Sequence, residues 1–190
     1  MHTTAIVQQV NAPWGLSRLS NGGTPLANKD TNALDFQYTF DDSSGGGTDA
    51  FILDTGCRVT HQDFAGRASC FPSNLPCADG NGREYPPLLP FPIPTPKIIN
   101  IRQPLPLPDG THVAGTIGGS VFGVAKNATL HCVKVMNDDG SGATSTIISG
   151  INAAAVEALA NGRPSVISMS LGGPPNVSID TAVCILPVDH

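Results

Sequence analysis

A carboxylate at the end of a short apolar segment is the residue of this sequence best placed to do chemistry. Asp54 follows the apolar run Ala50-Phe51-Ile52-Leu53 and begins the turn Asp54-Thr55-Gly56. A short apolar run that ends in a turn is typical of a buried β-strand. In open parallel sheets, ligands and catalytic groups gather at the carboxyl ends of the strands. We therefore expect Asp54 to lie at such an end, either as a catalytic group or as a carboxylate that caps a turn.

The cysteines and histidines do not have the spacing of a metal site. The five cysteines include no Cys-x-x-Cys pair, and the histidines are not spaced around them as zinc ligands are. We therefore expect no metal and no other cofactor, whereas the pairing of an odd number of cysteines stays open. Two N-glycosylation sequences begin at Asn127 and Asn176 and fit a secreted protein, but the first residues lack the basic and apolar regions of a signal peptide.

The segments that must position Asp54 alternate between strand and helix patterns. In chain order we expect a short helix over 12–19, a strand over 50–53, a closely packed helix over 110–119, a strand over 128–136, a helix over 144–161, a strand over 165–171 and a helix from about residue 178. Thr144 or Ser145 is predicted to cap the helix over 144–161, and Gly162 to end it. This alternation predicts an α/β fold with a parallel sheet.

Composition excludes several classes of protein. The net charge is −5, and only 13% of the 190 residues are charged, so the sequence offers no basic surface for nucleic acid. No apolar run approaches the ~18 residues that a membrane span needs. One segment stands apart, because nine of the 26 residues over 83–108 are proline. Proline blocks helices and sheet ladders, so we expect this block to be extended or irregular chain.

Several sequence blocks occur in an order that is specific to one family. They are Ala12-Pro13-Trp14-Gly15-Leu16, Leu53-Asp54-Thr55-Gly56 with Thr60-His61-Gln62-Asp63-Phe64, Gly110-Thr111-His112-Val113-Ala114-Gly115-Thr116, Gly123-Val124-Ala125, Val133-Lys134-Val135 with Asp139-Gly140-Ser141-Gly142, and Ser168-Met169-Ser170-Leu171-Gly172-Gly173. The sequence resembles the subtilases, and within them the proteinase K group of secreted serine endopeptidases. The resemblance covers roughly residues 12–82 and 110–186.

The resemblance implies a three-layer αβα fold with a mainly parallel sheet. It implies an N-terminal tail over 1–11 and, over 12–190, an incomplete peptidase domain that the Pro-rich block 83–108 interrupts. It also implies a peptide or protein substrate, an extracellular location and a monomer. The calcium sites of the family cannot be traced in this sequence.

By resemblance, Asp54 matches the catalytic aspartate of the family. In subtilases this carboxylate orients an imidazole, which activates a serine hydroxyl. The family motif is His-Gly-Thr-His-Val-Ala-Gly-Thr, but its first, catalytic position is Asp109 here, and His112 matches the second histidine. His112 lies ~4–5 Å further along the helix, too far to substitute. A second carboxylate beside Asp54 is no replacement either, because each disfavours ionisation of the other.

The nucleophile of the family is not found in this sequence. The family places it in Gly-Thr-Ser-Met-Ala, and neither this motif nor the oxyanion asparagine precedes His190. We therefore expect the chain to be inactive. The resemblance does retain two edges of a substrate cleft, with which an extended peptide would pair as an added strand. One edge is Gly140, Ser141 and Gly142, and the other is Ser170, Leu171 and Gly172; alternatively, these segments are only a Gly-rich turn and a buried strand end.

Three functional hypotheses stay open at this point. The chain is a serine endopeptidase by descent, a non-catalytic peptide-binding protein, or an unstable gene product. In the second case, Pro104-Leu105-Pro106-Leu107-Pro108 could instead dock on an SH3- or WW-type domain. In the third, a retained intron or misjoined exon would explain both the Pro-rich block and the altered residue 109, and transcript sequencing tests this.

Overall fold

The structure of the protein is a computed structural model that describes residues 5–20, 30, 33–71, 109–184 and 186. The Pro-rich block 83–108, the SH3- or WW-binding sequence within it and the expected irregular conformation lie outside the described residues. The elements in chain order are β1 (Ile6–Ala12), α1 (Trp14–Ser20), β2 (Phe36–Asp41), β3 (Asp49–Asp54), the 3-10 helix η1 (Gln62–Phe64), β4 (Ala68–Cys70), α2 (Asp109–Gly118), β5 (Thr129–Lys134), α3 (Thr144–Asn161), β6 (Ser165–Met169) and α4 (Val177–Cys184).

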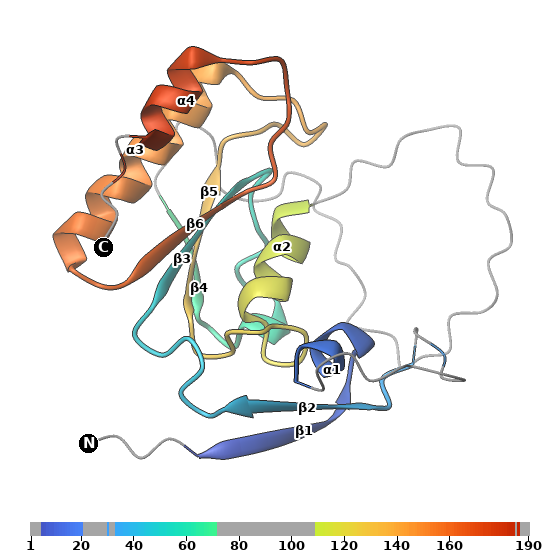
Figure 1. Ribbon diagram of the computed structural model, residues 1–190. Coiled ribbons are helices and arrows are strands. Elements are labelled where there is room, and N and C mark those ends of the chain that lie inside the picture. Colours follow the sequence, from blue (N-terminus) through green and yellow to red (C-terminus); the bar gives the residue numbers. More distant parts are fainter. Residues whose placement is uncertain (1–4, 21–29, 31–32, 72–108, 185, 187–190) are drawn as a thin grey trace, which may run out of the picture.

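A four-stranded parallel sheet forms the centre of the fold (Figure 1). Its strand order is β4-β5-β3-β6, so β3 pairs with β5 on one side and β6 on the other. All residues of β3 are buried, as expected for a central strand with both faces covered. The predicted strands over 50–53, 128–136 and 165–171 are confirmed, whereas the short edge strand β4 carries no alternating pattern that could have predicted it.

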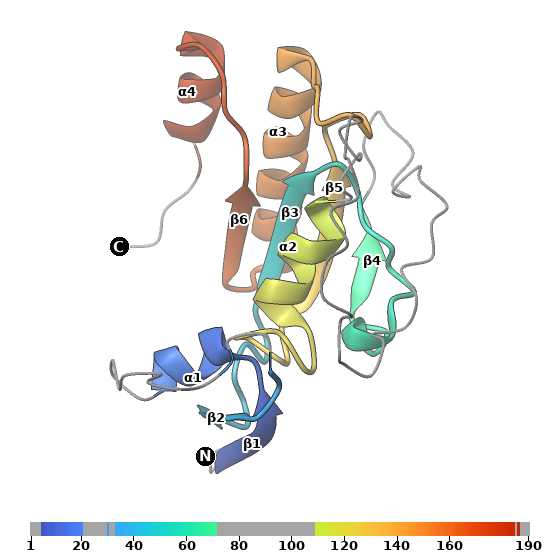
Figure 2. The same cartoon turned by 90° about the vertical axis from the view of Figure 1, so that its right-hand side faces the viewer.

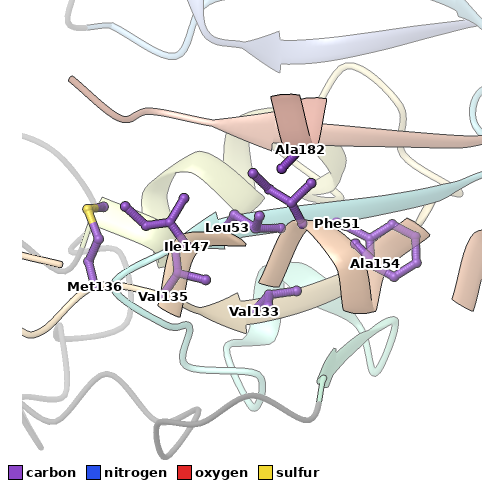
Figure 3. Packing of buried hydrophobic residues seen from close by; sticks show 9 residues of the cluster. Phe51, Leu53, Val133, Val135, Met136, Ile147, Ala154 and Ala182 are labelled. Atoms are coloured by element: carbon purple, nitrogen blue, oxygen red, sulfur yellow. The ribbon is translucent and has the colours of Figure 1, made fainter. Parts of the chain in front are cut away.

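Helices cover both faces of this sheet, as Figures 1 and 2 show. Phe51 and Leu53 point to the face of α3 and α4, where they pack with buried residues of β5 and α3 (Figure 3). Ala50 and Ile52 point to the opposite face and pack with α2 and η1. Side chains alternate between the two faces of a strand, so one apolar strand serves both cores. This arrangement confirms the predicted three-layer fold.

Two helix ends illustrate how local sequence sets the boundaries. Gly162 ends α3 with a φ of 63°, and its N–H donates to Ala158 O, as the sequence predicts. The predicted cap by Thr144 or Ser145 is wrong, because Ala143 is the cap residue and makes no side-chain cap hydrogen bond. Thr144 instead accepts a hydrogen bond from Asn176 at 3.2 Å through its hydroxyl, which ties α3 to the residue that precedes α4. Within the described residues, no helix combines the length and apolarity needed to cross a membrane.

The N-terminal segment is not the tail that was expected over residues 1–11. From Ile6 onward it forms β1, which pairs with β2 in an antiparallel two-stranded sheet. A small core between this sheet and helix α1 contains the buried residues Ala12, Leu16 and Tyr38. The expectation failed because β1 exposes most of its residues, and the strand is specified by its partner 30 residues later rather than by its own pattern.

Candidate active site

Asp54 lies where the sequence predicts, at the carboxyl end of the central strand β3. Its side chain is buried, and its Oδ1 accepts a hydrogen bond of 2.6 Å from the N–H of Thr55. Its carbonyl oxygen accepts hydrogen bonds from Val135 at 2.9 Å and Met136 at 3.2 Å, just beyond β5. The Thr55 N–H therefore holds the carboxylate, and the backbone of Asp54 is fixed to the segment that follows β5.

The first turn of α2 packs directly against this strand end. A Cβ on Gly110 would lie 2.2 Å from Gly56 O and 3.1 Å from Asp54 Cβ, so no larger residue fits at this position without a shift. The N–H of Gly110 faces Thr55 Oγ1 at 3.4 Å, and Thr111 Oγ1 accepts a hydrogen bond of 2.9 Å from the N–H of Arg58. Asp109 begins α2 immediately before Gly110. The backbone thus places position 109 beside the Asp54 strand end, where the resemblance expects a histidine.

His112 does not take the place of that histidine. It lies three residues further along α2 and is exposed. Its carbonyl oxygen accepts a hydrogen bond from Thr116 Oγ1 at 3.1 Å, which is an ordinary helical contact. The contacts that α2 makes at the Asp54 turn come instead from Gly110 and Thr111.

A buried lysine next to Asp54 was not identified from the sequence. Lys134 stands opposite Asp54 in the β3–β5 register and is only 6% exposed. Its Nζ donates to Thr55 O and lies 2.6 Å from Asp138 Oδ1. The lysine therefore connects the Asp54 turn to the loop after β5. The sequence signal that could have identified Lys134 is a charged residue among the apolar residues at the end of the predicted strand over 128–136.

The two predicted substrate-binding segments flank Asp54. The loop with Gly140, Ser141 and Gly142 follows β5, whereas Ser170, Leu171 and Gly172 follow β6. Because β3 lies between β5 and β6, both segments leave the sheet at the edge where Asp54 ends its strand. All of these residues are exposed except Leu171, which is partly buried against the α3-side core.

Hydrogen bonds shape the loop after β5. Gly140 has a φ of 79°, and Asn137 N–H donates to Ser141 O at 2.7 Å. The hydroxyl and N–H of Ser141 both donate to Asp139 Oδ1, at 2.6 and 2.8 Å, and these bonds lower the pKa of Asp139. The loop therefore holds a fixed shape, and Asp139 acts as a turn residue. In the part of the chain that the structure describes, no three His, Cys, Asp or Glu residues form a group that could hold a metal.

A disulfide fixes the Asp54 turn to the neighbouring strand. Cys57 and Cys132 are bonded, and both are buried on the α2 side of the sheet. The sulfur of Cys57 lies 3.5 Å from Gly110 O, so the disulfide also contacts the first turn of α2. Sequence alone left the pairing open, because residues 75 positions apart meet only through the sheet register.

Comparison with known proteins agrees with this geometry. Residues 109–184 match the profile of the subtilase family. The chain is 36% identical to proteinase T of Parengyodontium album, covering 94% of this chain and 51% of that protein, and 40% identical to the subtilisin-like serine protease AsES of Sarocladium strictum, covering 94% and 38%. A solved cold-adapted subtilisin-like serine proteinase superposes with a TM-score of 0.63 at 34% identity, covering 92% of this chain and 51% of that one.

The chain thus spans about half the length of these relatives or less. Its matches extend over both the Asp54 segment and the segments that flank it. The resemblance of the sequence motifs and the likeness of the fold lead to the same assignment. The chain belongs to the subtilase family.

Proposed function

We propose that this protein is a serine endopeptidase by descent whose 190-residue chain binds extended peptides without cleaving them. The observation that carries the proposal is the strand order β5-β3-β6, which sets Asp54 between the two exposed segments that follow β5 and β6. Cleft edges on either side of a catalytic carboxylate suit an extended peptide that pairs with them as an added strand. As in secreted peptidases, we expect the protein to act outside the cell and as a monomer.

The absence of cleavage follows from residue 109. Proton transfer from a nucleophile needs a group that accepts the proton within hydrogen-bond reach, and an imidazole oriented by a buried carboxylate fulfils this role. The backbone brings α2 to Asp54, but the residue that begins the helix is an aspartate. Two neighbouring carboxylates favour one shared proton rather than a base poised near neutral pH.

Two assays on the 190-residue chain test the proposal. Release of the chromophore from a peptide anilide measures cleavage, and fluorescence anisotropy of a labelled, extended peptide measures binding. We expect binding and no chromophore release. Gly172→Pro removes an N–H that a paired peptide would use, and the loss of one such bond lowers affinity about fivefold. Gly172→Ala keeps the N–H, and its Cβ would meet no atom within 4 Å, so it is the matched control.

Each assay has an outcome that contradicts its part of the proposal. Chromophore release by the wild-type chain that disappears in Asp54→Asn would show that residue 109 does not prevent cleavage. Lack of peptide binding, or equal affinities of the two Gly172 variants, would show that the segments after β5 and β6 are not cleft edges.

A further inference from the structure

A second group of chemically active side chains lies on the α3 face of the sheet, away from the active-site end. Asp49 begins β3, His131 lies in the middle of β5, and Ser69 lies in β4. His131 stands opposite Ser69 in the register of the neighbouring strands shown in Figure 1. Asp49 and Asp54 are five residues apart along β3, a separation of about 16 Å. This group is therefore distinct from the Asp54 site.

The imidazole of His131 bridges a buried carboxylate and an exposed hydroxyl. Its Nε2 lies 3.3 Å from Asp49 Oδ1, and its Nδ1 lies 3.4 Å from Ser69 Oγ. The Asp49 side chain is 1% exposed and that of His131 is 16% exposed, whereas Ser69 is open to solvent. Of the three side chains, the Ser69 hydroxyl is therefore the one that a substrate from solution can reach.

Surrounding residues fix the carboxylate and the ring. Asn161 Nδ2 donates to Asp49 Oδ2 at 2.8 Å, and an Arg163 guanidinium nitrogen lies 3.1 Å from Oδ1. The His131 ring stacks on Phe51, with 4.7 Å between centroids, and meets Phe71 edge to face at 6.1 Å. Packing therefore holds the ring with one nitrogen toward the carboxylate and the other toward the serine.

The ion pair with Arg163 and the hydrogen bond from Asn161 account for Asp49, but they do not account for the buried nitrogen of His131. His131 Nε2 is buried but forms no aligned hydrogen bond, which is costly in a folded protein and calls for a reason. Catalytic hydrogen bonds are often long or poorly aligned before a substrate binds. The Ser69 hydroxyl has a second acceptor at nearly the same distance, because Leu130 O lies 3.5 Å away and His131 Nδ1 3.4 Å away.

We propose that Ser69, His131 and Asp49 form a second acyl-transfer site that takes small, activated carboxylic esters. Ser69 Oγ attacks the ester carbonyl carbon while its proton moves to His131 Nδ1, and Asp49 orients the ring through Nε2–H. The ester C–O bond then breaks, and His131 gives this proton to the leaving-group oxygen, so that the leaving group departs as an alcohol or phenol and the ring is neutral again. Water next attacks the acetyl or other acyl group on Ser69, giving its proton to the ring, which returns one to Ser69 Oγ.

p-Nitrophenyl acetate is the probe that tests this site in the full 190-residue chain. We expect p-nitrophenolate release together with acetylation of Ser69, which mass spectrometry of proteolytic peptides locates. Ser69→Ala removes the acetylated peptide. His131→Asn slows acetylation at least about 100-fold, because it removes the general base. His112→Gln, which alters an exposed histidine elsewhere, leaves the rate within about twofold.

A second measurement separates catalysis from a general loss of folding. The melting transition of each variant is recorded by circular dichroism, and acetylation of the wild-type chain is also measured in urea and in heavy water. Proton transfer to His131 predicts a solvent isotope effect in the folded chain and loss of Ser69 acetylation after unfolding. Acetylation of Ser69 at the same rate in urea, no acetylation of Ser69 in the folded chain, or an unchanged rate in folded His131→Asn would each overturn the proposal.

Discussion

The disulfide between Cys57 and Cys132 should be a principal source of stability in this fold. The bond closes a loop across 75 residues of sequence and joins the Asp54 turn to β5. In the chain-entropy treatment, closing a loop of that length lowers the entropy of the unfolded chain by an amount equivalent to about 4.5 kcal/mol at 25 °C. Cys57→Ala/Cys132→Ala removes this constraint and also two buried sulfur atoms, whose loss adds a cavity cost.

Urea unfolding followed by circular dichroism measures the effect. A loss of about 4.5 kcal/mol, divided by a urea dependence of about 2–3 kcal/mol per molar, shifts the midpoint down by about 1.5–2.3 M. Cys184→Ala is the matched control, because Cys184 is an exposed free cysteine and its replacement should change stability by less than about 0.5 kcal/mol. The same midpoint for the double variant and for a wild-type chain shown by peptide mapping to carry the bond would refute the reasoning.

Four further variants test the packing and the buried lysines through the free energy of unfolding, measured in urea. Gly150→Ala should lower the free energy of unfolding by about 1–3 kcal/mol, because the new Cβ would lie 2.4 Å from a methyl group of Val135, just beyond β5. Gly115→Ala, where the new Cβ would lie in open space, should raise it by about 0.5 kcal/mol, and the same sign for both variants would contradict the packing. Burial lowers the pKa of Lys126 from 10.5 to about 8, so above about pH 8 the unfolded chain binds more protons than the folded chain. The free energy of unfolding should therefore rise by on the order of 1 kcal/mol toward pH 10. Lys126→Met should abolish this rise, and the same pH dependence in both proteins would contradict the prediction. Lys134→Met should lower stability by about 2 kcal/mol, since it leaves the buried carbonyl of Thr55 without its donor, and an unchanged midpoint would show that this contact is dispensable.

Features that depend on a local pattern could be predicted from the sequence. The apolar run before Asp54 becomes the central strand, and the helical spacing over 144–161 becomes α3 with Gly162 at its end. The positions of the exposed segments after β5 and β6 also follow, because parallel strands present their carboxyl ends at one edge. In each case, residues close in sequence carry enough information to specify the element.

Features that depend on register between distant segments could not be predicted in this way. β1 is specified by β2, the Cys57–Cys132 bond by the pairing of β3 with β5, and the contact of His131 with Ser69 by the pairing of β4 with β5. A shift of one residue would turn each of these side chains to the other face of its sheet. The Asp49 group thus becomes visible only when three strands are aligned.

The contacts around Asp54 also bear on the proposal that this chain keeps a peptide cleft without cleaving peptides. The first turn of α2 is held against the strand end by the small size of Gly110, by Thr111 accepting the N–H of Arg58, and by the buried disulfide beneath it. These contacts come from residues other than Asp109, and we expect α2 to begin at the same point when a histidine replaces Asp109. Under the proposed function, the fold can be retained independently of the chemistry, because a fold does not by itself require the catalytic groups that it positions.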